Sequence, residues 1–240
     1  DINGYLGNSN YYHIAKINKK FNERGNCVEE YYWGTDGQPC LCKDGYAKYT
    51  LKYDERGNLT EVSYFGTDNQ PCLSNEGFAK IIRHYDEREQ MDTESYWGTD
   101  GKPCLSKDGY AKITLHYDER GICDEQSYFG TEDQPCLSKD GYAKWTAHYD
   151  ERGNCDEQSF FGTDGQPCLS KVGYAQWKAY YDERGNMVEK SFFGTDGQPC
   201  LNINGPALYD YDPLYKDYET YSEGAPIKEE WNPTLTKEDG

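Results

Sequence analysis

Carboxylates recur along the chain at a spacing that raises the question of hydrolytic chemistry. They are separated by 32 residues or by twice that number, at Glu29, Glu61, Glu125, Glu157 and Glu189. Two carboxylates in one cleft can hydrolyse a glycosidic bond, but they need different environments that separate the pKa of the acid from the pKa of the base. Acids that recur in equivalent copies share one environment. We therefore expect no catalytic residues and no enzymatic activity.

Cysteines recur with the same period and raise the question of disulfides or a metal site. Six of them follow a proline, at Cys40, Cys72, Cys104, Cys136, Cys168 and Cys200. Equivalent residues of adjacent two-stranded units would lie roughly 10 Å apart, beyond the ~7 Å limit for a disulfide. Three further cysteines occupy a position that holds leucine or methionine in other copies, namely Cys27, Cys123 and Cys155. The sequence therefore favours free, buried thiols.

Histidines and aspartates are the remaining metal-ligand types, and their pattern is weak. His84, His116 and His148 stand in a row at 32-residue steps, at a position held by Lys20, Lys52 and Tyr180 elsewhere. That exchange is typical of solvated polar residues on the outer face of a strand. The Thr-Asp-Gly turns lack the dense aspartate spacing of a calcium loop, and no CxxC pair is present. We expect neither a metal nor a cofactor.

The best candidates for ligand contact are adjacent aromatic residues. They form the pairs Tyr32-Trp33, Tyr64-Phe65, Tyr96-Trp97, Tyr128-Phe129, Phe160-Phe161 and Phe192-Phe193. Neighbours in a strand point to opposite faces, so one member of each pair should pack in the core while the other forms a stripe. Such a stripe can stack on sugars or anchor a protein, unless both members pack against a loop or a neighbouring copy. The candidate contact residues are Tyr32, Tyr64, Tyr96, Tyr128, Phe160, Phe192, Trp33 and Trp97.

All these residues belong to a 32-residue repeat without insertions. Six copies occupy 13–44, 45–76, 77–108, 109–140, 141–172 and 173–204. Residues 1–12 are interpreted as the degenerate end of a preceding copy, and 205–240 as a partial seventh copy with an acidic, tyrosine-rich cap or linker. A unit of this length cannot bury its own apolar face, so neighbouring copies must stack.

Each copy has the pattern of a β-hairpin. Residues 46–53 alternate, with Ala47, Tyr49, Leu51 and Tyr53 on one face and polar residues on the other. The Asp-Glu-Arg-Gly-Asn segment 54–58 predicts a tight turn, and a second strand follows at 59–65. A short third strand is predicted at 39–41. Glycine or proline interrupts every few positions, so the predicted fold is all-β, an elongated solenoid-like stack of β-hairpin repeats.

Charge excludes several classes of partner. The net charge is −18 and the pI is near 4.6, which disfavours binding to nucleic acid or to anionic lipid because phosphate contacts need lysine and arginine. No apolar run approaches the roughly 20 residues of a membrane helix, so direct membrane insertion is not expected. We expect a monomeric fragment of a larger chain, without a targeting signal in the fragment itself.

Two motifs resemble known repeat families. The segment Tyr53-Asp54-Glu55-Arg56-Gly57-Asn58-Leu59 resembles the YD or RHS-type repeat and the related MORN-like hairpins. The segment Tyr64-Phe65-Gly66-Thr67-Asp68 is similar to the hairpins of choline- and glucan-binding cell-wall repeats. This resemblance implies hairpin arrays on bacterial surface or secreted proteins, with ligand sites at aromatics that here match Tyr32/Trp33, Tyr64/Phe65 and Tyr96/Trp97.

Together these observations predict a non-catalytic binding module at the surface of a bacterium or outside it. Identical units present identical contacts, and linked weak sites gain avidity. Cell-wall or host glycan is the first expected ligand. The alternatives are adhesion to a host or neighbouring protein, and a structural spacer or shell without a ligand.

Overall fold

The computed structural model describes residues 14–202, which form one antiparallel sheet of twelve strands in sequence order. The described residues contain no helix that could cross a membrane. The strands are β1 Lys16–Phe21, β2 Cys27–Trp33, β3 Lys48–Tyr53, β4 Leu59–Phe65, β5 Lys80–Tyr85, β6 Met91–Trp97, β7 Lys112–Tyr117, β8 Cys123–Phe129, β9 Lys144–Tyr149, β10 Cys155–Phe161, β11 Gln176–Tyr181 and β12 Met187–Phe193.

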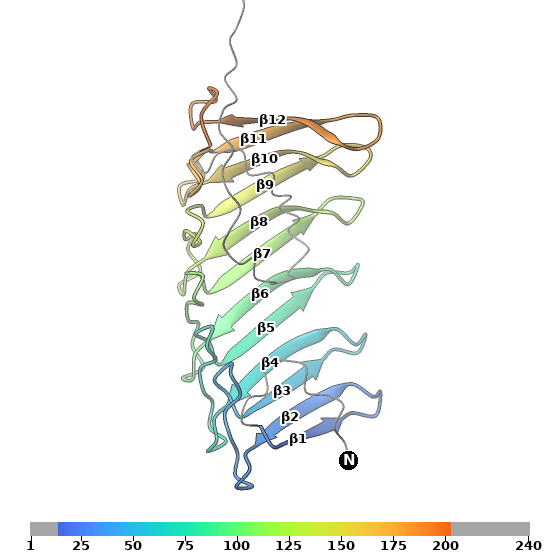
Figure 1. Ribbon diagram of the computed structural model, residues 1–240, viewed down its shortest axis with the longest axis vertical. Helices are drawn as coiled ribbons and strands as arrows, with labels where there is room; N and C mark the ends of the chain where they lie inside the picture. The colour runs from blue at the N-terminus through green and yellow to red at the C-terminus, as the bar shows by residue number, and fades with distance from the viewer. Residues whose placement is uncertain (1–13, 203–240) are drawn as a thin grey trace, which may run out of the picture. The chain divides into compact units, whose positions relative to one another are not determined.

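The strands form six hairpins, one in each copy, which confirms the predicted all-β hairpin repeat (Figure 1). Pairing is unequal along the sheet. The two strands of a hairpin are paired from one end to the other, as in β3 and β4, whereas β4 and β5 of successive hairpins pair only through Glu61, Val62 and Ser63. Adjacent hairpins therefore separate toward their turns. Figure 1 shows these turns apart from one another at the right-hand ends of the strands.

Each hairpin turn is closed by its first aspartate. In the second copy the Asp54 carboxylate accepts hydrogen bonds from the backbone amides of Arg56, Gly57 and Asn58 at 2.8–2.9 Å. Gly57 has φ of 100°, a left-handed conformation that glycine adopts without a steric penalty. The third copy places Glu89 at this position, with φ of 65°. That turn therefore carries the cost of a side chain in the left-handed region.

Replacing Glu89 with glycine should raise the free energy of unfolding by about 1 kcal/mol, because the left-handed conformation then costs nothing. The loss of the exposed contact between Glu89 and Arg56, at 4.0 Å, offsets little of this gain. The measurement is urea denaturation followed by circular dichroism. Gly153→Glu is the matched control, since φ is 88° there and the space around it is open. That variant should lose about as much as Glu89→Gly gains, and equal stability of all three proteins would contradict the argument.

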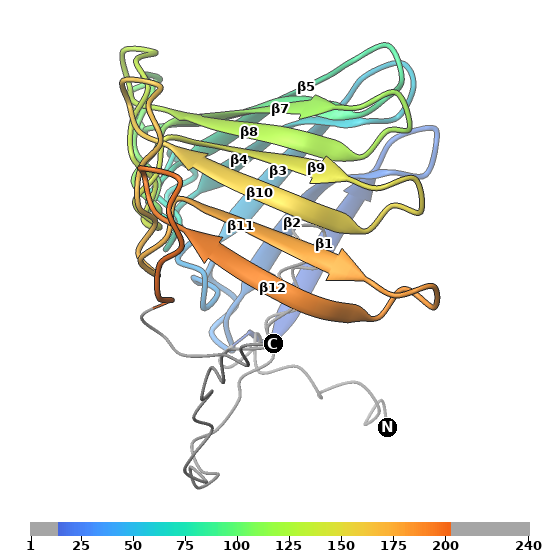
Figure 2. The ribbon, with the colours of Figure 1, turned by 90° about the horizontal axis from the view of Figure 1, so that it is seen from above.

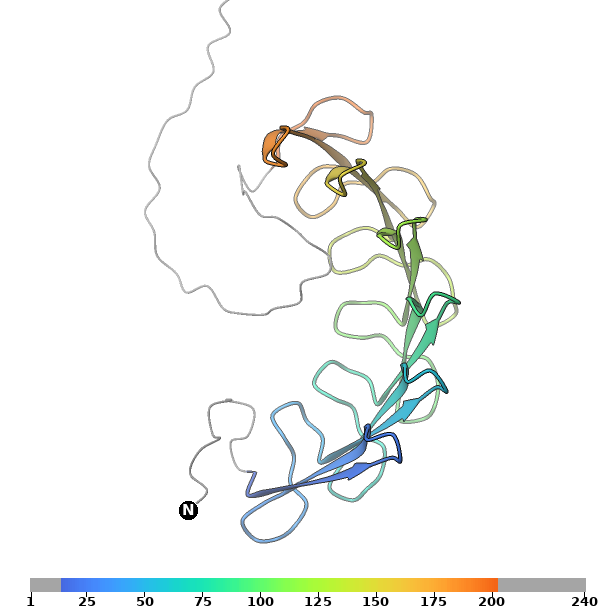
Figure 3. The ribbon, with the colours of Figure 1, turned by 90° about the vertical axis from the view of Figure 1, so that its right-hand side faces the viewer.

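The longer connections at the other edge of the sheet fold into two turns each and stack on one another. In the connection 66–79, Gly66 donates its amide to the carbonyl of Gln70 at 2.9 Å, and Ser74 donates to Phe78 at 2.8 Å. The second turn then bonds to the preceding copy, where the Asn75 amide donates to the Asp44 carbonyl at 2.8 Å. Figure 2 shows these connections gathered in a column at the edge opposite the hairpin turns, and Figure 3 shows them projecting on both sides of a curved sheet.

Alternation gives the sheet two unlike faces. Lys52 lies opposite Glu61 on one face, and Leu51 lies opposite Val62 on the other. We name these the polar face and the apolar face. This arrangement confirms the predicted alternation over 48–53, whereas Tyr46 and Ala47 precede the strand. The predicted third strand at 39–41 is reduced to a single bridge between Pro39 and Trp33, because the connection turns again at once to begin its second turn.

Candidate functional site

An aromatic stack covers the apolar face beside the connections. Its rings come alternately from the second strand of a hairpin and from the second turn of a connection, with consecutive centroids 4.6–6.2 Å apart. This range suits offset and edge-to-face ring contacts. The members are Tyr32, Tyr46, Tyr64, Phe78, Tyr96, Tyr110, Tyr128, Tyr142, Phe160, Tyr174 and Phe192.

Six of the eight candidate contact residues belong to this stack. Tyr32, Tyr96, Tyr128 and Phe160 are buried, while Tyr64 and Phe192 are partly buried. Burial raises the pKa of the Tyr64 phenol to about 12, so the ring stays uncharged at neutral pH. The four inner rings have ring neighbours on both sides, and Tyr32 and Phe192 stand at the two ends of the described stack. These six residues therefore pack in the core and do not form an exposed stripe. A turn residue such as Tyr46 fills the space between two strand aromatics, so no ligand can stack there.

The second members of the aromatic pairs lie on the polar face. Each of the six, Trp33, Phe65, Trp97, Phe129, Phe161 and Phe193, is partly exposed. Lysines from the neighbouring strand reach over three of the rings. The Nζ atom of Lys48 lies 4.2 Å from the centroid of Phe65, that of Lys112 lies 4.5 Å from Phe129, and that of Lys144 lies 5.6 Å from Phe161. These distances are typical of cation–π contacts. Three of the hairpins thus present a ring beside a lysine.

The two predicted tryptophans hold the same position with different neighbours. Trp33 stacks on Tyr31, with centroids 6.3 Å apart and planes inclined by 25°. The indole of Trp97 donates to the Ser95 hydroxyl at 3.0 Å. Both rings present part of their surface to solvent on the polar face. Of the eight predicted contact residues, these two are the ones on the polar face.

The strand side chains that point to the polar face carry no net charge in sum, although the chain as a whole is strongly acidic. The lysines on this face are Lys16, Lys20, Lys48, Lys52, Lys80, Lys112, Lys144 and Lys178, and the carboxylates are Glu29, Glu61, Asp92, Asp124, Glu125, Asp156, Glu157 and Glu189; the two sets are equal in number. Many form ion pairs, such as Lys144 with Glu125 at 2.7 Å. The surplus of negative charge therefore lies outside the polar face of these strands. We name the six partly exposed rings of this face the aromatic row; the side chains around it carry no net charge.

The three histidines lie on the polar face at its hairpin end, exposed as predicted. Each is paired with the aspartate at the second position of the second strand of its hairpin. The Nδ1 to Oδ1 distances are 2.7 Å for His84–Asp92, 2.6 Å for His116–Asp124 and 2.5 Å for His148–Asp156. Among residues 14–202 no cluster of three or more histidine, cysteine or acidic side chains is arranged to hold a metal ion.

The His116–Asp124 pair should make stability depend on pH. The hydrogen bond and the charge of Asp124 raise the pKa of His116 above its usual value near 6.5. A raised folded-state pKa stabilises the protein below about pH 6.5, and this stabilisation is lost as the pH rises through the folded pKa. Because the pair is exposed, the contribution should stay below about 1 kcal/mol. NMR titration of His116 should show the pKa falling in Asp124→Asn and unchanged in the control Glu119→Gln; an unchanged value in both would exclude the pairing.

The ten cysteines form no disulfides, and eight of their thiols donate hydrogen bonds to backbone carbonyl groups. The Pro-Cys thiols reach back to the first glycine of their own copy, as in Cys72 to the Gly45 carbonyl at 3.8 Å and Cys104 to Gly77 at 3.7 Å. Burial raises the pKa of Cys123 and of Cys155 to about 11. Such thiols carry little thiolate at neutral pH and are poor nucleophiles and metal ligands.

Two ion pairs with buried glutamates on the apolar face were not anticipated from the sequence. Arg83 and Glu94 lie on the apolar face, with Nε and Oε2 2.6 Å apart, and the hydroxyl of Tyr96 also donates to Glu94. The Glu94 position holds Val62, Gln126, Gln158 and Lys190 in four other copies, and in the first copy it holds Glu30, which pairs with Lys19 at 2.8 Å. The signal that could have revealed the Arg83–Glu94 pair is the joint appearance of arginine and glutamate in one copy. Its partners satisfy both charges, so it supports packing of the third hairpin.

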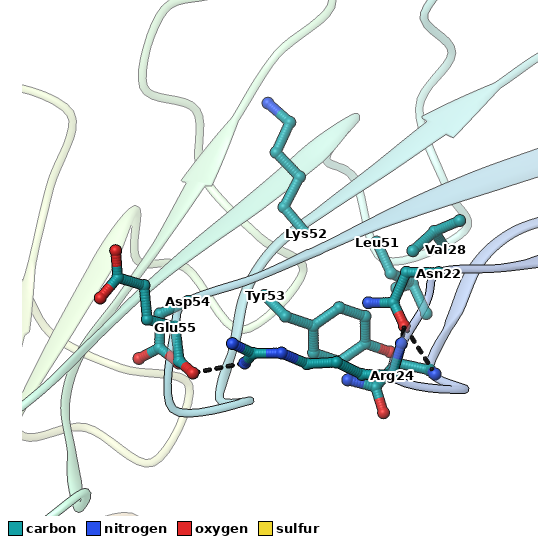
Figure 4. Close-up of a pocket in the computed structure, with 9 residues that line it drawn as sticks. Asn22, Arg24, Val28, Leu51, Lys52, Tyr53, Asp54 and Glu55 are labelled. Atoms are coloured by element: carbon teal, nitrogen blue, oxygen red, sulfur yellow. Dashed lines mark hydrogen bonds between the residues drawn. The ribbon is translucent and has the colours of Figure 1, made fainter.

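Shallow cavities lie in the seams where adjacent hairpins separate. One of about 470 Å³ lies between the first and second hairpins, where Arg24 reaches across to the carbonyl of Glu55 (Figure 4). An equivalent cavity of about 550 Å³ lies between the third and fourth. Tyrosine hydroxyls donate hydrogen bonds across the seam, as from Tyr53 to the Cys27 carbonyl at 3.0 Å. The residues that line these cavities thus link one hairpin to the next.

No family model and no curated protein matches the sequence. Among solved structures the chain is similar to the crystal structure of TcdB2-TccC3-TEV, with 12% identity and a TM-score of 0.41, over 76% of this chain and 9% of that chain. It is also similar to the Photorhabdus luminescens Tc holotoxin pore with a TccC3 mutation, with 9% identity and a TM-score of 0.33, over 75% and 10% of the two chains. A further match is TcdB2-TccC3, with 10% identity and a TM-score of 0.34, over 76% and 11%. The chain spans about a tenth of the length of these chains.

Proposed function

We propose that this hairpin-repeat chain is a non-catalytic module of a bacterial surface or secreted protein and that it binds carbohydrate at several equivalent places. The observation that carries the proposal is the aromatic row of the polar face, with one partly exposed ring in each of the six hairpins. Flat apolar rings stack on the C–H faces of sugars, and polar groups around them can bond to hydroxyls. Repetition at a fixed step allows weak contacts to add up along one polymer chain.

The surroundings of the row support a neutral glycan. Lysine and carboxylate side chains are equal in number on these strands, so an anionic polymer gains no net attraction there. A sugar that stacks on Phe129 would move the ammonium group of Lys112 from the ring face to its rim, where it can donate to a hydroxyl. The Ser95 hydroxyl beside Trp97 offers a further hydrogen-bonding partner.

The test is a screen of neutral and anionic glycans, followed by titration calorimetry with the best ligand. The variant Trp97→Ala/Phe129→Ala removes two neighbouring rings from the polar face, and affinity should fall at least tenfold because avidity depends on adjacent sites. The control Thr114→Ser lies on the same face without altering a ring. Full affinity in the double variant would exclude the aromatic row as the site. Absence of binding to every glycan would favour a spacer without a ligand.

A further inference from the structure

A row of solvent-exposed leucines runs along the connections, at the end of the strands opposite the hairpin turns. Each follows a Pro-Cys pair, and five of them are half exposed: Leu41 51%, Leu73 51%, Leu105 50%, Leu137 50% and Leu169 51%. We name these five residues the leucine row. Neighbouring members lie one copy apart, and one copy advances the sheet by two strand spacings, about 9.6 Å. The sequence repeat had placed leucine after each Pro-Cys pair, but only the structure shows that these side chains are exposed.

The chain's own packing does not explain why this position is leucine in every copy. Other exposed positions vary between copies, as where Lys52 is replaced by His84 and Tyr180. A half-exposed leucine gains only part of the free energy of burial, so a serine or lysine would serve the fold nearly as well. Scattered exposed leucines are ordinary. An unbroken row of identical ones is a repeated apolar surface of the kind that marks an interface.

We propose that the leucine row binds an amphipathic α-helix of a partner protein, with apolar side chains every seven residues and basic side chains beside them. Seven residues of helix rise about 10.5 Å, so the mismatch with the row is about 1 Å per copy. Two or three successive leucines therefore stay in register with one face of the helix. An extended strand presents same-face side chains about 6.8 Å apart and loses register after one step.

Charge selects a basic partner over a second copy of this chain. The five connections 34–47, 66–79, 98–111, 130–143 and 162–175 contain ten carboxylates and five lysines. With a net charge of −18, two copies repel each other, whereas a helix with flanking lysines is attracted. The salt bridge between Lys139 and Asp108, at 2.8 Å, already engages one of the lysines beside the row.

The probe is a synthetic helical peptide of about 28 residues, with leucine at one position of each heptad, alanine elsewhere on that face and lysines on both flanks. A second peptide has the same composition with its leucines dispersed around the helix. Fluorescence anisotropy should show that the heptad peptide binds at least tenfold more tightly than the dispersed one. Equal binding of both peptides, which reports charge alone, would overturn the proposal, as would failure of the heptad peptide to bind.

The protein variant for this test is Leu73→Ser/Leu105→Ser/Leu137→Ser, which removes three neighbouring members of the row. It should weaken binding of the heptad peptide at least tenfold, while circular dichroism in the absence of urea shows the same folded β-sheet spectrum as the parent. The double variant Trp97→Ala/Phe129→Ala should bind the peptide like the parent, which separates this surface from the glycan site. Undiminished binding to the serine variant would overturn the proposal. So would a concentration-dependent dimer of the parent that the serine variant abolishes, since a second copy would then be the occupant.

Discussion

Replacement of Tyr128 with alanine is expected to lower the free energy of unfolding by about 3–5 kcal/mol. Tyr128 is 7% exposed and lies in the middle of the aromatic stack, 4.8 Å from the ring of Tyr110 and 5.9 Å from that of Tyr142. Its loss removes ring contacts on both sides and leaves a cavity between two turns that cannot collapse without breaking their hydrogen bonds. Urea denaturation followed by circular dichroism and by tyrosine fluorescence measures the effect.

The adjacent residue provides the control for this prediction. Phe129 is also an aromatic residue of β8, but it faces the polar side, where solvent reaches part of the ring. Phe129→Ala should therefore cost clearly less than Tyr128→Ala, on the order of 1–2 kcal/mol. If the two variants were equally stable, the two faces of the sheet would contribute alike, and the aromatic stack would not be the principal core.

Deletion of one whole copy is expected to leave a folded protein. Removal of 109–140 joins Asp108 to Gly141 and recreates the Lys-Asp-Gly-Tyr sequence of the connection. Every bond between hairpins then finds an equivalent partner in the next copy, because each hairpin contacts only its neighbours. The dependence of the unfolding free energy on urea should fall by about a sixth, in proportion to the surface that unfolding exposes.

Deletion of half a copy should have the opposite result. Removal of 109–124 eliminates β7 and its turn, so the connection leads directly into β8, which runs in the reverse direction. The apolar and polar faces of all later strands then conflict with the earlier ones, and we expect aggregation or loss of cooperative unfolding. Cooperative unfolding of this variant, monitored in the same urea titration, would show that strand order does not depend on the 32-residue step.

The sequence was sufficient for much of the fold, since the information lies within single copies. The second strand predicted at 59–65 coincides with β4, and the turn at 54–58 closes as its aspartate and glycine require. The two faces follow from strict alternation between Leu51 and Lys52. These features are local, and six repetitions of one pattern average out the irregularities of any single copy.

The candidate site was less predictable, because it depends on contacts between copies. Alternation showed that Tyr128 and Phe129 point apart, but it did not show which face the connections cover. That choice depends on how a connection folds back over the sheet to insert Tyr142 between Tyr128 and Phe160. The exposure of the leucine row depends on the same fold-back. Neither feature has a periodic signal within one strand.

The unequal pairing of the strands has a mechanical consequence. A pull applied across the sheet, from one end to the other, loads the seams between hairpins, where only three residue pairs join strands such as β4 and β5. The seams should yield before the fully paired hairpins, and a hairpin that has lost its neighbour unravels next. Each such event releases 32 residues, about 110 Å of extended chain. Under tension the array would lengthen in equal steps as hairpins unfold one by one. It would shorten again when the load is removed and the hairpins refold.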